Sequence, residues 1–362
     1  TVGEFMYRER AVVDAAWHQI EDNLTRHGVV RVQAQARFSG PDSVEVTHFN
    51  EAPRRISADV FLLATGSRPS HPREIPFDGR IVVDSDDILS LTAIPNRMVV
   101  IGGGVIGCEY ASIFAALGVR VTLVNAKERL LMQVDTDLSD ALRQEMTRRM
   151  GMQVVLDASV TAVRVEGDLG LVTLGDGREL VADCVLYCAG REGNTHDLGL
   201  EAAGVRTNAR GFVQVDAAYR TNNPRIFAAG DIIGFPALAS TAMEQARVAM
   251  CHAFDLRYKT AVSAVLPYGV WTIPELATVG VGDLGTQLET TMENIRAILE
   301  RMDFASALEP DSSIDSFYRV YLRHAEDLEA VRRRFSEIVG PGPAERTVFL
   351  QAPICRSALL LE

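Results

Sequence analysis

The sequence of 362 residues predicts an α/β protein, and three observations support this class. Short apolar runs rich in β-branched residues alternate with longer segments whose apolar residues recur at helical spacing. Glycine-containing turns join several of these runs to the helical segment that follows. Apolar residues make up 47% of the chain, which is ample for the cores of two or three domains.

The clearest element is a strand, a tight turn and a helix that begin at Met98. Residues 98–101 form a short β-branched run suited to a strand buried on both faces. Residues 102–107 read GGGVIG and satisfy the pattern G-x-G-x-x-G directly after that strand. We expect a helix from Ile106 to about Leu117, and a second strand at Val119–Val124. This order is typical of a Rossmann-like nucleotide-binding domain.

Each glycine of the pattern has a physical reason. Gly102 allows the tight turn, Gly104 lets a pyrophosphate approach the backbone, and Gly107 lets the helix pack closely on the sheet. Ile106 opens the helix, whose N-terminal amides and dipole favour a diphosphate. The segment therefore predicts a dinucleotide site, with a glycine-rich packing turn as the alternative interpretation.

The residues after the second strand bear on nucleotide preference. An acidic residue there bonds the adenosine ribose of NAD and repels the 2′-phosphate of NADP. This chain has Asn125 instead, with Lys127 and Arg129 close behind. An asparagine can bond a hydroxyl without carrying charge, and a lysine or arginine can neutralise a phosphate. We therefore expect the site to accept NADP, alongside NAD, although a solvated charged loop also explains the pattern.

The residues before this domain predict one long helix, several strands and a short helix. The helix, from Glu4 to about His27, carries spaced apolar residues and ends at a glycine. The expected strands are Val29–Phe38, Ser43–His48 and Ile56–Ala64, and the expected short helix is Ser85–Leu91.

The residues after it continue the alternation of strands and helices. The expected elements are a helix at Asp135–Met150, antiparallel strands at Val154–Val165 and Gly170–Leu174, apolar strands at Cys184–Ala189 and 225–229, and a helix from about Ser240 to Phe254. From about residue 284 we expect an apolar helical stripe at 288–302, strands at 316–323, 347–351 and 358–361, and a helix at 327–339.

Charge and composition restrict the partners. The net charge of −12 argues against nucleic acid or an anionic membrane as the main partner. No apolar run approaches the ~18 residues of a membrane span, and the first residues do not resemble a signal peptide. The cysteines lie in apolar contexts without metal-ligand spacing, so we expect no metal and reduced thiols in a cytoplasmic protein. They are Cys108, Cys184, Cys188, Cys251 and Cys355.

Residues 1–283 resemble the FAD-dependent pyridine nucleotide-disulfide oxidoreductase superfamily and, within it, the soluble (Si-specific) NAD(P)+ transhydrogenases. The segments that carry the resemblance are 66–72, 84–91, 102–114, 188–195, 229–247 and 268–280. The resemblance implies an oxidoreductase in which NADPH reduces FAD and the reduced flavin passes hydride to NAD+. A dihydrolipoamide dehydrogenase-like reductase is the alternative within the superfamily, but such enzymes normally carry an acidic residue where Asn125 stands.

The resemblance also assigns roles to residues. Contacts with NAD(P) are implied for Gly102, Gly104, Val105, Ile106, Gly107, Asn125, Lys127, Arg129, Gly190 and Arg191. Contacts with FAD are implied for Thr65, Gly66, Gly230, Asp231, Leu238 and Ala239. Glu109 is implied as a catalytic residue at the face between nicotinamide and flavin, and the alternative is a carboxylate that only favours the helix dipole.

The chain also departs from the superfamily. In the superfamily a flavin-binding G-x-G-x-x-G normally lies well upstream of an A-T-G segment. That segment is residues 64–66 in this chain, yet residues 1–63 contain no such glycine pattern. The C-terminal interface domain, which supplies the dimer contact in related reductases, is expected after Gly280 and is not recognisable there. We therefore interpret the chain as truncated or fused, and expect weak or absent FAD binding in isolation. The competing hypothesis is a flavin-free NAD(P)-binding module, catalytically impaired and fused to a remnant.

These features predict four segments. Residues 1–95 and 214–283 are two pieces of a partial FAD-binding domain, and residues 96–213 are an NAD(P)-binding Rossmann domain inserted between them. Residues 284–362 form a small α+β tail that resembles the C-terminal part of a chorismatase, related to the RidA-like fold. By that analogy Arg356 and Glu362 fall near a ligand cleft.

The substitution Asn125→Glu tests whether charge at this position sets the nucleotide preference. We expect Asn125→Glu to weaken NADP(H) binding much more than NAD(H) binding, because it places a negative charge beside the 2′-phosphate. Nucleotide titration measures both affinities. Comparable losses for the two nucleotides would show that charge at position 125 does not set the nucleotide preference.

Overall fold

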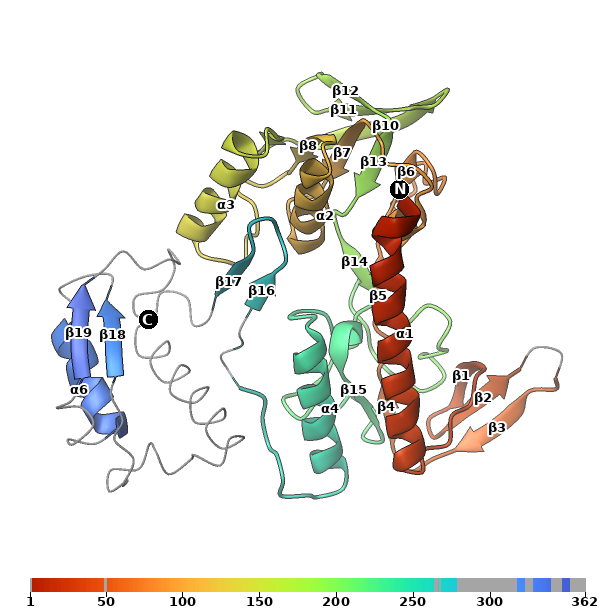
Figure 1. The fold of residues 1–362 in the computed structure, drawn as a ribbon. Coiled ribbons are helices and arrows are strands. Elements are labelled where there is room, and N and C mark those ends of the chain that lie inside the picture. Colours follow the sequence, from red (N-terminus) through yellow and green to blue (C-terminus); the bar gives the residue numbers. More distant parts are fainter. Residues whose placement is uncertain are drawn as a thin grey trace. The chain divides into compact units, whose positions relative to one another are not determined.

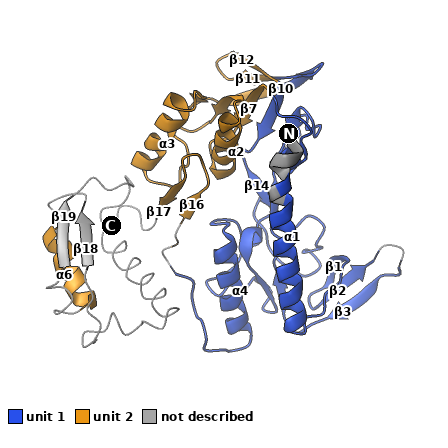
Figure 2. Cartoon of the chain, in the orientation of Figure 1, with its two compact units in different colours: residues 1–95, 163–170, 183–263 blue, residues 96–162, 171–182, 264–362 orange. Residues whose placement is uncertain are grey.

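The computed structural model describes residues 2–48, 51–263, 266, 268–278, 318–322, 328–339 and 347–351 (Figure 1). The chain divides into two compact units (Figure 2). Unit 1 comprises residues 1–95, 163–170 and 183–263, and unit 2 comprises residues 96–162, 171–182 and 264–362. Strands and helices alternate along both units, so the predicted α/β class is confirmed.

Unit 2 contains the predicted strand, turn and helix. Strands β7, β8 and β9 lie side by side in parallel, and helices α2 and α3 follow β7 and β8 in the chain. Their bounds are β7 Arg97–Ile101, α2 Val105–Ala116, β8 Arg120–Val124, α3 Thr136–Arg148 and β9 Gln153–Val155. The apolar residues of β7 are buried, as expected of a central parallel strand. The glycine turn at 102–104 connects β7 to α2, which confirms this part of the prediction.

The single strand predicted at 154–165 is wrong. β9 ends at Val155 in the parallel sheet, and β10 (Val160–Glu166) begins a separate three-stranded sheet with β11 (Leu169–Leu174) and β12 (Glu179–Ala182). The chain turns between β9 and β10 because Asp157 adopts a left-handed backbone, with φ +52°. The N–H of Asp157 donates to the carbonyl of Lys127 over 3.1 Å, which draws the chain toward the loop after β8.

Unit 1 contains a long helix, a second helix and several short strands. Its helices are α1 Val2–Arg26 and α4 Ala239–Ala253, with short 3₁₀ turns η1 Asp87–Ser90 and η2 Gly230–Ile233. Its strands are β1 Gln35–Gly40, β2 Ser43–Thr47, β3 Arg54–Ser57, β4 Phe61–Leu63, β5 Ser67–Pro69, β6 Val82–Val83, β13 Cys184–Tyr187, β14 Arg191–Gly193 and β15 Ile226–Ala228.

The compact units divide the chain differently from the predicted domain boundary at 213. β13 pairs in parallel with β6, and β14 pairs in antiparallel fashion with β5. Residues 183–213 therefore belong to unit 1, so the predicted segment 96–213 is divided in the structure. β4 and β15 pair in parallel, and within the described residues they form a two-stranded sheet.

Two strands predicted in unit 1 are shorter than expected. The segment 29–34 is not a strand, because it turns back beside α1: Arg31 pairs with Glu21 and lies over the ring of Trp17, 5.6 Å from its centroid. The predicted strand 56–64 is split into β3 and β4. Phe61 starts a new pairing there, donating its N–H to the carbonyl of Arg225 over 2.9 Å.

The tail has the predicted order of strand, helix and strand. β18 (Tyr318–Leu322) and β19 (Thr347–Gln351) pair in parallel, and α6 (Leu328–Val339) lies between them in the chain. The buried residues of α6 are Val331, Phe335 and Val339, which share one helical face. The predicted stripe at 288–302, the strand at 358–361, Arg356 and Glu362 lie outside the described residues.

The described helices and cysteines add two findings. In the part of the chain that the structure describes, no helix combines the length and the apolar character that crossing a membrane demands. Four cysteines, at 108, 184, 188 and 251, carry free thiols. Burial raises the pKa of Cys184 and of Cys188 to about 12, so both thiols stay protonated at neutral pH. Cys355 lies outside the described residues.

Candidate nucleotide-binding site

The glycine turn of unit 2 brings the start of α2 close to the end of β7. Gly102 has φ +118°, and its N–H donates to the carbonyl of Val124 over 2.8 Å. A Cβ on Gly107 would lie 1.9 Å from the carbonyl oxygen of Gly102, so only glycine permits this approach. Residues 102 and 107 therefore serve the helix–sheet contact as the sequence predicted.

Gly104 has a different environment from Gly107. It is the N-cap residue of α2, no side chain caps the helix there, and a Cβ on Gly104 would meet no atom within 4 Å. The first amides of Val105 and Ile106 therefore begin an uncapped helix beside open space. Such an end provides N–H donors and a positive partial charge, which suit the diphosphate of a dinucleotide.

Asn125 lies directly after β8, as predicted, but its side chain is buried, with 8% of the residue exposed. Its Oδ1 accepts the N–H of Gly103 over 3.1 Å. Its Nδ2 donates to the carbonyls of Arg129 over 2.8 Å and Lys127 over 3.3 Å. The carboxamide is thus committed to the backbone, which differs from the predicted direct bond to a ribose hydroxyl.

The two basic side chains of this loop, those of Lys127 and Arg129, differ in whether they are bonded to the backbone. The guanidinium of Arg129 donates to the carbonyls of Val134 over 2.7 Å and Met132 over 3.1 Å. Lys127 is exposed, and no group in the described ranges pairs with its ammonium. Lys127 is therefore the better placed of the two to meet a phosphate.

Glu109 is half-buried on α2 and accepts the N–H of Trp271 over 2.8 Å. Burial raises the pKa of this carboxyl, and the bond from Trp271 partly offsets the rise. One turn further along α2, Ser112 accepts the N–H of Ile273 through its Oγ over 3.0 Å. The sequence predicted no role for Ser112 or Trp271, although Trp271 falls in the segment 268–280, which carries part of the resemblance to the superfamily.

A second cluster lies in unit 1 around Ser67. Its Oγ donates to the carboxylate of Asp231 over 3.1 Å and accepts the Nε–H of Arg191 over 2.8 Å. The Nη2 of Arg191 also donates to the Ser67 carbonyl, over 2.8 Å. Arg191, predicted with the NAD(P) set, therefore shares a network with Asp231 of the FAD set. Sequence reasoning missed Ser67, whose one signal was its place directly after Thr65-Gly66.

The remaining residues of the predicted FAD set are also in unit 1. Gly230 has φ +79°, and its N–H donates to the buried side chain of Gln245 over 2.8 Å. Leu238 is the N-cap of α4, and no side chain caps the amides of the helix that begins at Ala239. Thr65 donates its hydroxyl to the carbonyl of Asn194 over 2.9 Å. Gly66, with φ +73°, and Gly190 flank β5 and β14, respectively.

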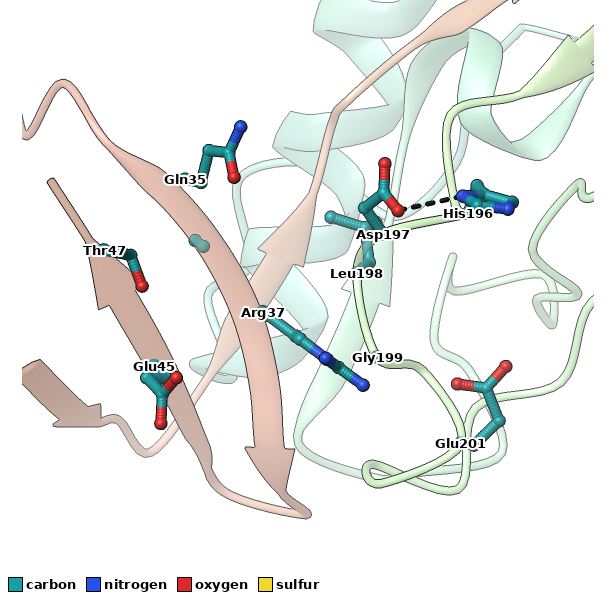
Figure 3. A pocket seen from close by; sticks show the side chains of 10 residues that line it. Gln35, Arg37, Glu45, Thr47, His196, Asp197, Leu198, Gly199 and Glu201 are labelled. Atoms are coloured by element: carbon teal, nitrogen blue, oxygen red, sulfur yellow. Dashed lines mark hydrogen bonds and ion pairs between the residues drawn. The ribbon is translucent and has the colours of Figure 1, made fainter. Parts of the chain in front are cut away.

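A separate cavity of about 590 Å³ lies in unit 1 between β1, β2 and the loop after β14 (Figure 3). His196 and Asp197 form an exposed pair at its rim, 2.9 Å apart. The lining residues are Gln35, Ala36, Arg37, Glu45, Thr47, His196, Asp197, Leu198, Gly199 and Glu201, and none belongs to the predicted site. Throughout the described ranges, no cluster of three or more His, Cys, Asp or Glu residues suits a metal ion.

The Rossmann-like turn and the order of the strands define the class of protein. Residues 6–246 match the family model described as pyridine nucleotide-disulphide oxidoreductase. Because this match covers more than half of the chain, the chain belongs to that family, which confirms the resemblance seen in the sequence.

Three similar proteins carry the name soluble pyridine nucleotide transhydrogenase. The chain is 42% identical over 255 residues to the soluble pyridine nucleotide transhydrogenase of Colwellia psychrerythraea, covering 70% of this chain and 54% of that protein. It is 44% identical over 247 residues to the Pseudomonas aeruginosa protein of the same name, covering 68% and 52%. The Mycobacterium tuberculosis protein of that name is 37% identical over 298 residues, covering 82% and 62%. The chain thus spans about half the length of the first two relatives.

Solved structures agree with this family. LpdA from Mycobacterium tuberculosis superimposes with a TM-score of 0.72 at 28% identity, covering 84% of this chain and 69% of LpdA. The HOCl-induced flavoprotein disulfide reductase RclA from Escherichia coli gives a TM-score of 0.68 at 27% identity, covering 76% and 62%.

Two glycines of the turn separate nucleotide binding from folding. Gly104→Ala places a methyl group in open space at an ordinary φ of −81°, so thermal stability should change little. NADPH affinity should fall about tenfold or more, because the methyl stands where the diphosphate approaches. Gly107→Ala is the matched contrast: its methyl meets the Gly102 carbonyl, and overpacking should cost about 1–3 kcal/mol or more of stability. Thermal unfolding and titration measure both, and full NADPH affinity in Gly104→Ala contradicts the site.

Glu109→Gln tests the burial of that carboxylate. Glutamine keeps an oxygen for the Trp271 N–H, so the fold should persist. In the wild type the folded-state pKa is raised, so the unfolded state releases its proton first. The free energy of unfolding should therefore fall as pH rises from about 4.5 through the raised value, and the variant should lack this fall. Denaturant unfolding across this pH range measures it, and parallel curves would refute the burial effect.

Proposed function

We propose that this chain carries the nucleotide site of a flavin-dependent pyridine nucleotide oxidoreductase of the transhydrogenase type. The observation that carries the proposal is the glycine turn, which places an uncapped helix start beside open space at Gly104. Relatives named soluble pyridine nucleotide transhydrogenase support the type of reaction. NADPH and NAD+ are the proposed substrates, and because the relatives are named soluble, we propose that this protein works in the cytoplasm.

The chain's own residues bind and orient the nucleotide in this proposal. The amides that begin α2 hold the diphosphate, and the ammonium of Lys127 neutralises the 2′-phosphate of NADPH. Glu109, on the same helix, orients the nicotinamide ring. FAD supplies the hydride chemistry when bound, accepting hydride from NADPH and donating it to NAD+.

Residues of unit 1 fit one side of the flavin. Asp231 suits a ribityl hydroxyl or the polar groups beside it, and the uncapped amides at the start of α4 suit polar atoms of the isoalloxazine. Because Ser67 joins Arg191 to Asp231, we assign Arg191 to this flavin set as the cation for the flavin diphosphate. Thr65, Gly66, Gly230, Leu238 and Ala239 complete the set.

A second candidate is an NAD(P)-binding module that does not retain flavin. Two observations favour it. Within the described residues, the turn at 102–104 is the one glycine-rich link between a strand and a helix, and β4 and β15 form a sheet of two strands. A flavin diphosphate buried without such a helix start loses hydration that the guanidinium of Arg191 alone replaces only in part. We also propose that this protein forms homo-oligomers, as its resemblance to the superfamily implies.

A visible spectrum and a hydride-transfer assay distinguish the two candidates. The full chain is incubated with excess FAD, part of it is desalted for a spectrum, and NADPH-dependent reduction of thio-NAD+ is measured with FAD present. We expect NADPH binding with less than stoichiometric flavin, because the described residues supply one side of a flavin site. Transfer to thio-NAD+ supports the transhydrogenase type. A colourless protein that binds NADPH without transfer supports the module, and failure to bind any nucleotide contradicts both.

A further inference from the structure

We propose that Asn125 is a positioning residue, which fastens the glycine turn to the loop that carries Lys127 and does not itself recognise the nucleotide. This inference rests on the proposed nucleotide site and assigns the specificity of that site to the loop. Asn125 acts through its neighbours, so we call the three hydrogen bonds of its carboxamide the Asn125 clasp.

The Asn125 clasp uses every donor of the side chain. Both N–H groups of Nδ2 donate to carbonyls of the loop, those of Lys127 and Arg129, and Oδ1 accepts the N–H of Gly103. The backbone of Asn125 is also paired: its N–H donates to Val155 over 2.8 Å, and its carbonyl accepts from Ala158 over 3.0 Å. A residue bonded on all these sides is well placed to hold a loop.

The Asn125 clasp also explains the middle glycine of the run GGG, which the motif itself leaves free. A Cβ on Gly103 would lie 2.7 Å from the Cγ of Asn125 and 2.8 Å from a methyl of Leu130. The carbonyl of Gly103 in turn accepts the N–H of Leu131 over 2.8 Å. Both the N–H and the carbonyl of Gly103 are therefore bonded to the segment 125–131, so hydrogen bonds join the glycine turn to the loop.

A carboxylate cannot replace this carboxamide. It accepts the N–H of Gly103, but it has no proton for the carbonyls of Lys127 and Arg129 and would face their oxygens. Alanine removes all three bonds and leaves the Gly103 N–H and the Arg129 carbonyl without this partner, whereas the Lys127 carbonyl keeps its bond from the Asp157 N–H. An uncharged group that both donates and accepts is thus the physical requirement at position 125.

The consequence for specificity lies with Lys127. The guanidinium of Arg129 is bonded to the carbonyls of Val134 and Met132, whereas Lys127 is exposed. The carbonyl of Lys127 accepts both from the clasp and from the N–H of Asp157, so the clasp is one of two bonds that set where this side chain leaves the loop. The glycine turn serves the diphosphate of both nucleotides, and the loop serves the 2′-phosphate of one.

Two single variants separate the Asn125 clasp from a charge effect. Asn125→Ala removes the clasp without adding charge, and Ala126→Asp adds charge at an exposed neighbour while leaving the clasp intact. We expect Asn125→Ala to weaken NADH by about tenfold or more, because the turn is shared, and NADPH further, because Lys127 loses its position. Ala126→Asp should weaken NADPH alone. Titration of the full chain with each nucleotide measures these affinities.

A double-mutant cycle with Lys127→Ala tests positioning rather than general stability. Lys127→Ala should weaken NADPH alone in the wild type and add little in the Asn125→Ala background, because the lysine is already misplaced. Unchanged affinities in Asn125→Ala, a loss confined to NADPH, or full additivity with Lys127→Ala would overturn the proposal. If Asn125→Ala does not fold, Asn125→Ser replaces it, since serine is uncharged and has one donor in place of two.

Amide hydrogen exchange keeps this test independent of the proposed function. Exchange over residues 126–134 should be about tenfold faster or more in Asn125→Ala than in the wild type, with β7 and β8 unchanged. If the wild type binds neither nucleotide, the proposed function fails, and faster exchange still supports the clasp as a structural element. Unchanged exchange over 126–134 overturns it.

Discussion

The contact between the first turn of α2 and the end of β7 is the constraint on which unit 2 depends. Gly107 approaches the carbonyl of Gly102 so closely that no side chain fits between them. This contact fixes the helix on the parallel sheet and leaves its N-terminus uncapped at Gly104. The same helix holds residues 271–273 through Glu109 and Ser112, so the position of that segment follows from the packing of α2.

The two units organise polar groups in different ways. In unit 2, the neutral carboxamide of Asn125 ties backbone groups together, and the guanidinium of Arg129 is bonded to carbonyls of its own loop. In unit 1, the hydroxyl of Ser67 lies between the opposite charges of Arg191 and Asp231. In unit 2 the donors and the cation meet backbone carbonyls, which hold a loop in shape, whereas opposite charges joined by a hydroxyl offer both signs to a polar ligand.

The sequence predicts the glycine turn well because its tightest constraint is local: the residue that meets Gly107 is Gly102, five positions before it. It predicts less where partners are distant. Arg191 meets Ser67 across 124 positions, and no residue near either one signals that pairing. The break in the predicted strand 154–165 depends on one left-handed residue, Asp157, in a run whose alternation suits a strand throughout. For Asn125, the sequence identifies a polar residue at the right position but not the direction of its side chain, which the loop carbonyls decide.

The placement of the two tryptophans gives each unit its own optical reporter. The chain has only Trp17 and Trp271. Trp17 lies in unit 1 under the guanidinium of Arg31, whose charge perturbs the indole ring. Trp271 lies in unit 2, is 70% exposed, and is joined through its backbone to Glu109. Because Trp17 is also 54% exposed, quenchers in the solvent reach both indoles, and a Trp17→Phe variant would leave Trp271 as the intrinsic reporter of the α2 helix.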